Sequence, residues 1–141
     1  MTAILHLSLP VRDLEEARAF YVDALGCRPG RERPGWVDVW FWGMQLTLCE
    51  RPDAVTPVTE QDVRHFGVSL DADELWDVVA RLAQIAGVEW LTPLTTATDP
   101  ALSGKTSVKV ADPSGNVVEL KSYAAEDELR GMTTATDHGP A

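Results

Sequence analysis

The chain has 141 residues, of which 45% are hydrophobic and 24% are charged, as in a single globular domain with one core. Its formal net charge of −10 argues against nucleic acid and anionic membranes as partners, because both would repel it. The N-terminal residues include neither a basic segment nor a long apolar run, so we expect no signal peptide and no transmembrane helix. The two cysteines, Cys27 and Cys49, are too few for a disulfide framework and favour a cytoplasmic protein.

The first half of the chain predicts one helix among four strands. The strands are residues 3–9, 27–33, 36–41 and 44–49. Pro10 is expected to end the first strand, because proline cannot donate a hydrogen bond to a neighbouring strand. Asp13 is a typical N-terminal cap for a helix that continues to Leu25, and Gly26 suits its C-terminal end. The dipeptide Trp42-Gly43 predicts a two-residue hairpin loop between the last two strands.

The register set by this loop separates the side chains of the hairpin into two faces. One face is apolar and is expected to pack against the helix: Val37, Val39, Phe41, Met44, Leu46 and Leu48. The other face combines aromatic and polar side chains: Trp36, Asp38, Trp40, Gln45, Thr47 and Cys49. A strand face of this mixed kind is typical of a cavity wall.

The second half of the chain repeats the order of the first. We expect a linker at 51–62, a strand at 63–70, a helix at 72–86, a strand at 88–92, a loop at 93–104 and a hairpin with arms 105–111 and 116–122. The turn between the two arms contains Pro and Gly at positions that suit a three-residue loop. This loop predicts a register that places Lys109 beside Glu119 and Ser107 beside Lys121.

Both halves therefore have the order βαβββ, and the predicted fold class is α+β with two copies of one module. We expect a single domain at residues 1–123, with module one at 3–50 and module two at 63–123. Residues 124–141 are small and polar and are expected to be a frayed C-terminal tail.

The repeat places polar side chains at equivalent positions of the two modules. His6 and His65 lie in the opening strands, and Gln45 and Glu119 lie in the closing strands. Two imidazoles and one carboxylate suit a divalent transition metal and leave coordination positions open for a substrate. We therefore interpret His6, His65 and Glu119 as metal ligands, with Gln45 as a fourth polar group. Two alternatives stay open: the histidines as hydrogen-bonded core residues, and Glu119 as the ion-pair partner of Lys109.

Two segments also carry a resemblance to a known family. One runs from His6 to Tyr21 and continues with Leu25-Gly26, and the other runs from Asp112 to Leu120. They resemble the opening and closing signatures of the vicinal oxygen chelate superfamily, which includes glyoxalase I, extradiol dioxygenases, fosfomycin-resistance transferases and bleomycin-resistance proteins. The resemblance covers residues 3–123 and implies a cup-shaped mixed sheet with helices on its convex side.

The resemblance implies the same ligands as the repeat. His6 matches the first metal ligand of the family, His65 the second and Glu119 the last. Gln45 stands where glyoxalase I has an additional glutamate ligand, so a four-ligand site of that type is not expected. Bleomycin-binding members typically lack these ligands, and their presence here argues against pure sequestration.

Two further residues receive roles from the resemblance. Ser8 matches a threonine that acts in the fosfomycin transferases, and Lys109 falls where those enzymes contact the antibiotic. We therefore name Ser8 and Lys109 as candidate catalytic residues. Segments 93–104 and 124–130 contain no counterpart of the potassium-binding loop or the C-terminal arginine of those transferases, which weakens the transferase interpretation.

The family chemistry implied by the resemblance is chelation of two vicinal substrate oxygens by the metal, which acts as a Lewis acid. Fe(II) or Mn(II) is favoured for two histidines and one carboxylate, and Zn or Ni is possible. Among enzyme classes we rank a dioxygenase (an oxidoreductase) first, a glyoxalase-type lyase or isomerase second and a thiol transferase third. The alternative from another class is a non-catalytic protein that sequesters a hydrophobic ligand.

The expected partners are a small-molecule substrate and a second copy of the chain. The predicted substrate cavity is lined by Gln45, Trp36, Trp40, Thr47 and Ser107, and its two tryptophans favour an apolar or aromatic substrate. Open strand edges and a tryptophan-rich face predict a homodimer, as the resemblance does. The sequence leaves open whether the site closes within one chain or across the dimer.

Overall fold

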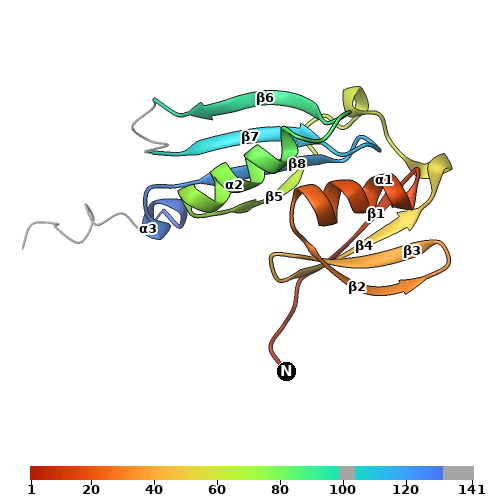
Figure 1. The fold of residues 1–141 in the computed structure, drawn as a ribbon. Coiled ribbons are helices and arrows are strands. Elements are labelled where there is room, and N and C mark those ends of the chain that lie inside the picture. Colours follow the sequence, from red (N-terminus) through yellow and green to blue (C-terminus); the bar gives the residue numbers. More distant parts are fainter. Residues whose placement is uncertain (99–103, 132–141) are drawn as a thin grey trace, which may run out of the picture.

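The computed structural model describes residues 1–98 and 104–131 and consists of two βαβββ modules (Figure 1). The elements of module one are β1 (His6–Val11), α1 (Leu14–Arg18), β2 (Arg28–Arg33), β3 (Trp36–Phe41) and β4 (Met44–Glu50). Those of module two are β5 (Phe66–Ser69), α2 (Ala72–Leu82), β6 (Glu89–Thr96), β7 (Thr106–Ala111) and β8 (Val117–Ser122). In each module the first strand pairs in parallel with the last, which gives the sheet orders β1-β4-β3-β2 and β5-β8-β7-β6. The predicted α+β class with two equivalent modules is confirmed.

The helix of module one begins where the sequence predicts. The Asp13 carboxylate accepts a hydrogen bond from the backbone N–H of Glu16 at 2.9 Å and so caps the first turn. Beyond Arg18 the helix continues as a π-helix, η1 (Ala19–Ala24), and Gly26 then turns the chain with a φ of 80°. The predicted extent is correct, and the π-helical winding of its second half is not visible in the apolar periodicity.

Two strands continue through prolines, contrary to prediction. β1 passes Pro10 and ends at Val11, and β6 passes Pro93 and occupies part of the predicted loop 93–104. Both are edge strands of their sheets. At an edge, the nitrogen of proline can face away from the neighbouring strand, so its missing N–H costs no ladder hydrogen bond.

The opening strand and the helix of module two are shorter than predicted. β5 begins at Phe66 rather than at residue 63, so His65 lies immediately before the strand. α2 ends at Leu82 rather than at residue 86. His65 therefore sits in the connection that enters the sheet, and not within a strand as expected.

The segments without predicted structure contain short helices. The linker forms the 3-10 helices η2 (Pro52–Ala54) and η3 (Val58–Glu60). The predicted tail contains the helical turn α3 (Glu126–Leu129), and its residues 132–141 lie outside the described part of the chain. Within the described residues, no helix is long and apolar enough to span a membrane.

Both predicted hairpin registers are confirmed. Trp42 and Gly43 form the two-residue loop with φ of 44° and 90°, as a type I′ turn requires. In the other hairpin, Lys109 pairs with Glu119. In both hairpins, the side chains therefore point to the faces of the sheet that the sequence predicts.

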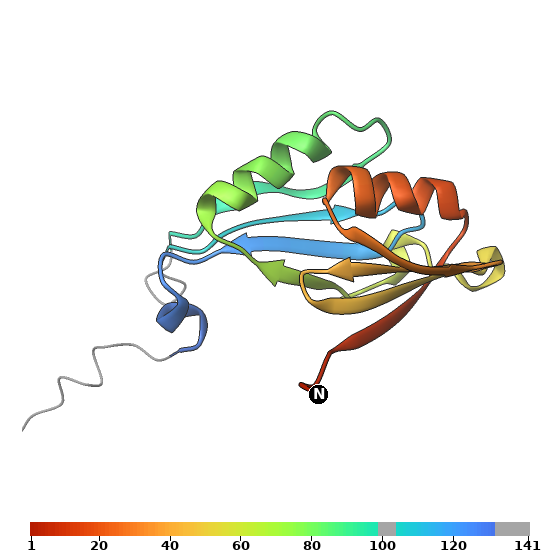
Figure 2. The same cartoon turned by 60° about the horizontal axis from the view of Figure 1, so that its bottom comes forward.

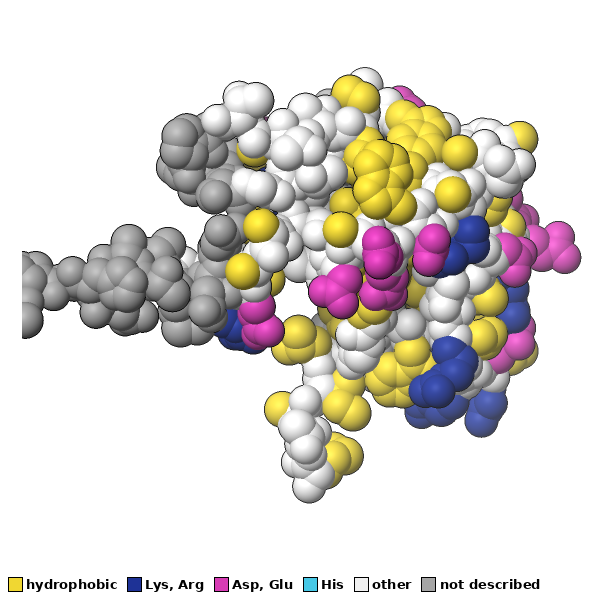
Figure 3. Space-filling view, turned by 60° about the vertical axis from the view of Figure 1, so that its left-hand side comes forward, with side chains coloured by type: hydrophobic (Ala, Val, Ile, Leu, Met, Phe, Trp, Pro, Cys, Tyr) yellow, Lys and Arg dark blue, Asp and Glu magenta, His cyan; other side chains and the backbone are white. Residues whose placement is uncertain are grey.

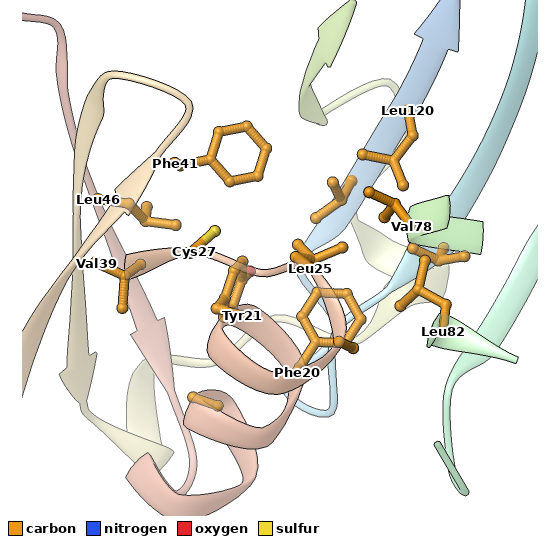
Figure 4. Close-up of a cluster of buried hydrophobic side chains, with 14 of the residues drawn as sticks. Phe20, Tyr21, Leu25, Cys27, Val39, Phe41, Leu46, Val78, Leu82 and Leu120 are labelled. Carbon is orange, nitrogen blue, oxygen red and sulfur yellow. The ribbon is translucent and has the colours of Figure 1, made fainter. Parts of the chain in front are cut away.

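The two helices lie on the same side of the sheets (Figure 2), and their apolar side chains join those of the strands in one core (Figure 4). The predicted helix-facing side of the β3–β4 hairpin is part of this core, with Val39, Leu46 and Leu48 fully buried. The helices thus cover one face of each sheet. The opposite face of each sheet carries the polar side chains and is available for a site.

The turn of each hairpin contacts the other module. The Tyr21 hydroxyl, on η1, donates a hydrogen bond to the Asp112 carboxylate at the β7–β8 turn over 2.7 Å. In the opposite direction, the Trp42 indole N–H at the β3–β4 turn donates to Glu74 of α2 over 2.8 Å. Burial raises the pKa of Asp112, although hydrogen bonds from Asn116 and Tyr21 oppose the increase. These reciprocal contacts join the two modules into one unit.

Candidate metal centre

The module-two part of the site brings a histidine, a carboxylate and a lysine together. His65 Nε2 lies 3.0 Å from Glu119 Oε2, and Lys105 Nζ lies 3.2 Å from Glu119 Oε1. Glu119 is buried, and all three residues line a pocket of about 620 Å³ that Ser107 and Lys109 also line. We call this pocket the carboxylate pocket. It contains two of the three predicted metal ligands.

The hydrogen bond of His65 determines which ring nitrogen is available. Nδ1 lies 2.8 Å from the Val63 carbonyl oxygen, which can only accept, so Nδ1 carries the proton. In a neutral imidazole Nε2 then has a free lone pair, and it faces the Glu119 carboxylate. Two lone pairs at 3.0 Å repel each other unless a proton or a metal ion lies between them. The donor set therefore fits a divalent metal, and the carbonyl contact orients the histidine as outer-shell partners do in metal sites.

Glu119 stays ionised in this environment. Burial alone would raise the pKa of Glu119, but the hydrogen bond and charge of Lys105, with Lys121 and His65, lower it below its usual value. Lys105 is absent from the sequence-based site, which names Lys109 as the neighbouring cation. The alternation of residues 105, 107 and 109 on one face of the strand contained the signal for Lys105.

Lys109 keeps its predicted register, and the alternative in which it forms an ion pair with Glu119 is not what the structure shows. It is paired with Glu119 across the ladder and lines the carboxylate pocket, yet the ion pair with Glu119 belongs to Lys105. In the described part of the chain, Lys109 has no ion-pair partner, and its backbone N–H donates to Thr92 Oγ1 at 2.9 Å. Lys109 is therefore a cation available to a ligand in this pocket.

The module-one part of the site forms around His6. His6 Nδ1 lies 3.1 Å from the Gln45 backbone carbonyl, so this nitrogen donates and Nε2 has the lone pair, as in a neutral His65. Ser8 Oγ lies 3.3 Å from His6 Nε2. A pocket of about 370 Å³ is lined by His6, Ser8, Arg31, Trp36, Asp38, Gln45, Thr47 and Cys49. We call it the histidine pocket. The predicted wall residues of β3 and β4 all line this pocket except Trp40, for which the prediction is wrong.

A buried carboxylate organises the floor of the histidine pocket. Asp38 is 2% exposed and accepts hydrogen bonds from Thr47 Oγ1 at 2.6 Å, Gln45 Nε2 at 3.1 Å and Arg31 Nε at 3.1 Å. Burial alone would raise the pKa of Asp38, but these three donors outweigh burial and lower it. Because its amide nitrogen is bound to Asp38, Gln45 is held in one orientation beside His6.

The substitution Asp38→Asn should reduce stability most at neutral pH. A carboxylate whose pKa is lowered by folding contributes stability above its unfolded pKa of roughly 3.9, and that contribution is lost as the pH falls through the lower folded value. We expect the variant to lose about 1–3 kcal/mol at pH 7 and less at pH 3. Urea unfolding of both proteins at these two pH values measures the difference. A gap between parent and variant that is the same at both pH values would contradict this assignment.

The two parts of the site do not meet within one chain. The carboxylate pocket and the histidine pocket share no lining residue. In residues 1–98 and 104–131, no three His, Cys, Asp or Glu side chains gather closely enough to hold a metal ion. The face shown in Figure 3 presents apolar, acidic and basic side chains, and no described histidine is visible on it. Within one chain, the described residues therefore bring together two of the three predicted ligands, His65 and Glu119, and leave His6 in a separate pocket.

The family is established by comparison with known sequences. The model of the glyoxalase/bleomycin resistance protein/dioxygenase superfamily matches residues 3–120. The chain therefore belongs to this superfamily, as its two signature segments predict. No curated protein matches the sequence.

Solved structures share the fold over nearly the whole chain. A glyoxalase/bleomycin resistance protein/dioxygenase from Alicyclobacillus acidocaldarius is 28% identical, with a TM-score of 0.76 over 91% of this chain and 96% of that chain. The fosfomycin resistance protein FosX from Listeria monocytogenes is 18% identical, with a TM-score of 0.72 over 92% and 99%. A structure of this FosX complexed with Mn(II) and sulfate is 17% identical, with a TM-score of 0.71 over 94% and 99%.

Proposed function

We propose that the chain is the subunit of a homodimeric, metal-dependent enzyme that acts on a small molecule with two vicinal oxygens. His6 of one chain, with His65 and Glu119 of a second chain, would hold one divalent metal in each of two equivalent sites. The observation that carries the proposal is that both histidines donate through Nδ1 to a backbone carbonyl, so that in the neutral imidazole Nε2 has the lone pair that a metal requires. Two histidines of identical tautomer and one ionised carboxylate form a facial set with open positions.

The exposed surface near the histidines supports a dimer. His6 opens β1 and His65 precedes β5, and both strands are free edges of their sheets. The apolar side chains beside them are exposed: Ile4 by 51%, Leu5 by 75% and Val63 by 79%. An open edge flanked by apolar side chains favours association with another strand. Pairing of β1 in one chain with β5 in another would cover these side chains and bring His6 to the carboxylate pocket.

The chemistry of the site favours two histidines and one glutamate as the complete ligand set. When bound, the metal would supply Lewis acidity to a pair of substrate oxygens. Gln45 is committed to Asp38, which does not suit a glyoxalase-type site with a fourth ligand. We therefore place dioxygenase chemistry before lyase or isomerase chemistry. Fe(II) or Mn(II) is the favoured metal, and the Mn(II) complex of the Listeria FosX supports a divalent ion in this fold.

The proposed function is tested by metal content and molar mass measured on the same preparation. Light scattering at micromolar concentration should give the mass of a dimer, and metal analysis should give one divalent ion per chain. A panel of catechols, 2-oxoaldehyde–thiol adducts and fosfomycin then identifies the reaction, which chelation should abolish. A monomer without metal would refute the proposal. A metal-free dimer that binds a hydrophobic ligand equally before and after chelation would establish the sequestering alternative.

We also propose that Lys109 contacts an anionic group of the substrate. Lys105 already pairs with Glu119, so a second cation in the carboxylate pocket is costly unless an anion lies near it. Lys109→Met should therefore keep the metal and lose turnover of the substrate found with the panel, whereas Lys105→Met should alter metal binding through Glu119. Metal analysis beside the activity assay separates the two lysines. Loss of metal in Lys109→Met would instead make Lys109 a support for Glu119.

A further inference from the structure

A β-bulge directs Arg31 into the histidine pocket. In the β2–β3 ladder Pro29 pairs with Val39 and Glu32 pairs with Val37, so Gly30 and Arg31 together face the single residue Asp38. An extra residue in one strand bends that strand and redirects its side chains, and bulges of this kind often lie beside functional sites. Arg31 thereby lines the same pocket as His6, although it comes from the strand farthest from β1 in the sheet.

The close approach of the bulge depends on Gly30. A Cβ atom at this position would lie 3.1 Å from the Cβ of Asp38 and 3.3 Å from Nε1 of Trp40. These contacts are tighter than ordinary van der Waals packing, so glycine allows β2 to lie against the buried carboxylate. The bulge is therefore matched to the position of Asp38.

Two neighbours hold the Arg31 guanidinium in place. Its Nε donates to Asp38 Oδ2 at 3.1 Å, and its central carbon lies 5.6 Å from the centroid of the Trp36 ring. The Arg31 side chain is nevertheless 70% exposed, whereas that of Asp38 is 3% exposed. Only Nε of its nitrogens donates to a described residue, which leaves both terminal NH2 groups of the guanidinium available.

A purely structural role does not account for this arrangement. Ion pairs with such an exposed partner contribute little to stability, and Asp38 already accepts hydrogen bonds from Thr47 and Gln45. The contacts with Asp38 and Trp36 instead restrict the conformations of the Arg31 side chain at the wall of the pocket. A preorganised guanidinium binds a planar or tetrahedral oxyanion through two parallel N–H groups at a smaller entropic cost.

We propose that Arg31 anchors an oxyanion group of the ligand, a carboxylate or a phosphonate, in the histidine pocket. This inference deepens the proposed function, because it assigns a charge to the substrate of that site. Asp38 and Trp36 act as positioning residues for the guanidinium. A ligand with an aromatic body and one anionic group would match Trp36 and Arg31 together.

The test measures binding of benzoate, phenylphosphonate and the neutral benzyl alcohol to the full chain by calorimetry. Arg31→Gln should weaken binding of the preferred anion at least about tenfold, the loss expected for one charged hydrogen-bonding partner, and leave benzyl alcohol unchanged. Arg31→Lys should give an intermediate affinity, because lysine keeps the charge and loses the two parallel donors. Whichever of benzoate and phenylphosphonate binds Arg31→Gln with the larger loss of affinity shows whether Arg31 prefers a carboxylate or a phosphonate. Arg28→Gln is the matched control, since Arg28 is an exposed arginine of the same strand outside the pocket.

Each measurement is made on metal-loaded and metal-free protein, with metal content and thermal unfolding recorded for every variant. Equal anion affinity in the parent and Arg31→Gln, with the metal retained, would overturn the anchor and leave the proposed function intact. A parent that binds neither anion more tightly than benzyl alcohol would also overturn it. Absence of metal from the parent would instead refute the proposed function, and the metal-free titrations would still test Arg31.

Discussion

Replacing Gly67 by alanine should destabilise the chain and disturb the carboxylate pocket together. Gly67 lies in β5 directly beside Glu119 of β8, and a Cβ atom there would overlap the backbone carbonyl of Glu119. No rotation of a side chain can relieve a collision with backbone, so the two strands must move apart. Overpacking of this kind costs about 1–3 kcal/mol, and we expect a value near the upper limit. The displacement would also separate Glu119 from His65 and Lys105.

The effect of Gly67→Ala is measured by urea unfolding and by metal titration of the folded variant. Ser69→Ala, two positions further along the same strand, is the control for a small change on that face of β5. We expect the control to resemble the parent in both measurements. A Gly67→Ala protein with parental stability and parental metal affinity would show that β5 is not held against Glu119 as described.

His65→Ala should abolish metal binding at micromolar metal without unfolding the chain. His65 is exposed and lies outside the core, so its removal should cost little stability. Loss of an outer-shell partner already weakens metal sites roughly 10–100-fold, and loss of a direct ligand should exceed that range. The variant should therefore retain the fold and the dimer while its affinity for Mn(II) falls at least about a hundredfold.

The measurement is equilibrium dialysis against Mn(II), with the metal bound per chain determined in the parent and the variant. Arg64→Ala is the matched control, because Arg64 is the exposed neighbour of His65 in the same connection. Undiminished metal in His65→Ala would remove His65 from the ligand set. Equal loss in both variants would indicate a disturbed connection rather than a lost ligand.

The sequence predicted those features of the fold that depend on local pattern. Alternation and the Trp42-Gly43 loop specify the β3–β4 register, and the Pro- and Gly-containing turn specifies the β7–β8 register that places Lys109 beside Glu119. The Asp13 cap specifies where the first helix begins. Each of these signals acts over a few neighbouring residues, so it can be recognised in the sequence without knowledge of the tertiary structure.

Features that depend on partners distant in the sequence were not predictable in the same way. The strand-ending effect of Pro10 depends on whether β1 is an edge strand, which the sheet order decides. The bulge that brings Arg31 to Asp38 shifts the register of β2, and no turn signal marks it. The alternation places Lys105 and Lys109 on one face, but which of the two lysines pairs with Glu119 depends on how their side chains lie in the folded pocket.

In the candidate site, too, some features follow from the sequence pattern and others depend on how distant segments pack. Equivalence of the two modules indicated His6, His65 and Glu119, because the repeat itself relates these positions. The repeat does not say whether equivalent positions meet in one chain. That depends on how the modules pack, and the contact between Tyr21 and Asp112 is part of the packing that leaves His6 in a pocket of its own.

A mixed dimer tests the shared metal centre most directly. His6→Ala and Glu119→Ala chains, co-expressed with different affinity tags and purified through both tags in succession, give dimers that contain one chain of each kind. Suppose that each site takes His6 from one chain and Glu119 from the other. One site of the mixed dimer then has all three ligands, and the other site lacks both His6 and Glu119. Each variant alone should then bind no metal, and the mixed dimer should recover the metal of one site. A mixed dimer as empty as its two parent variants would contradict the shared centre.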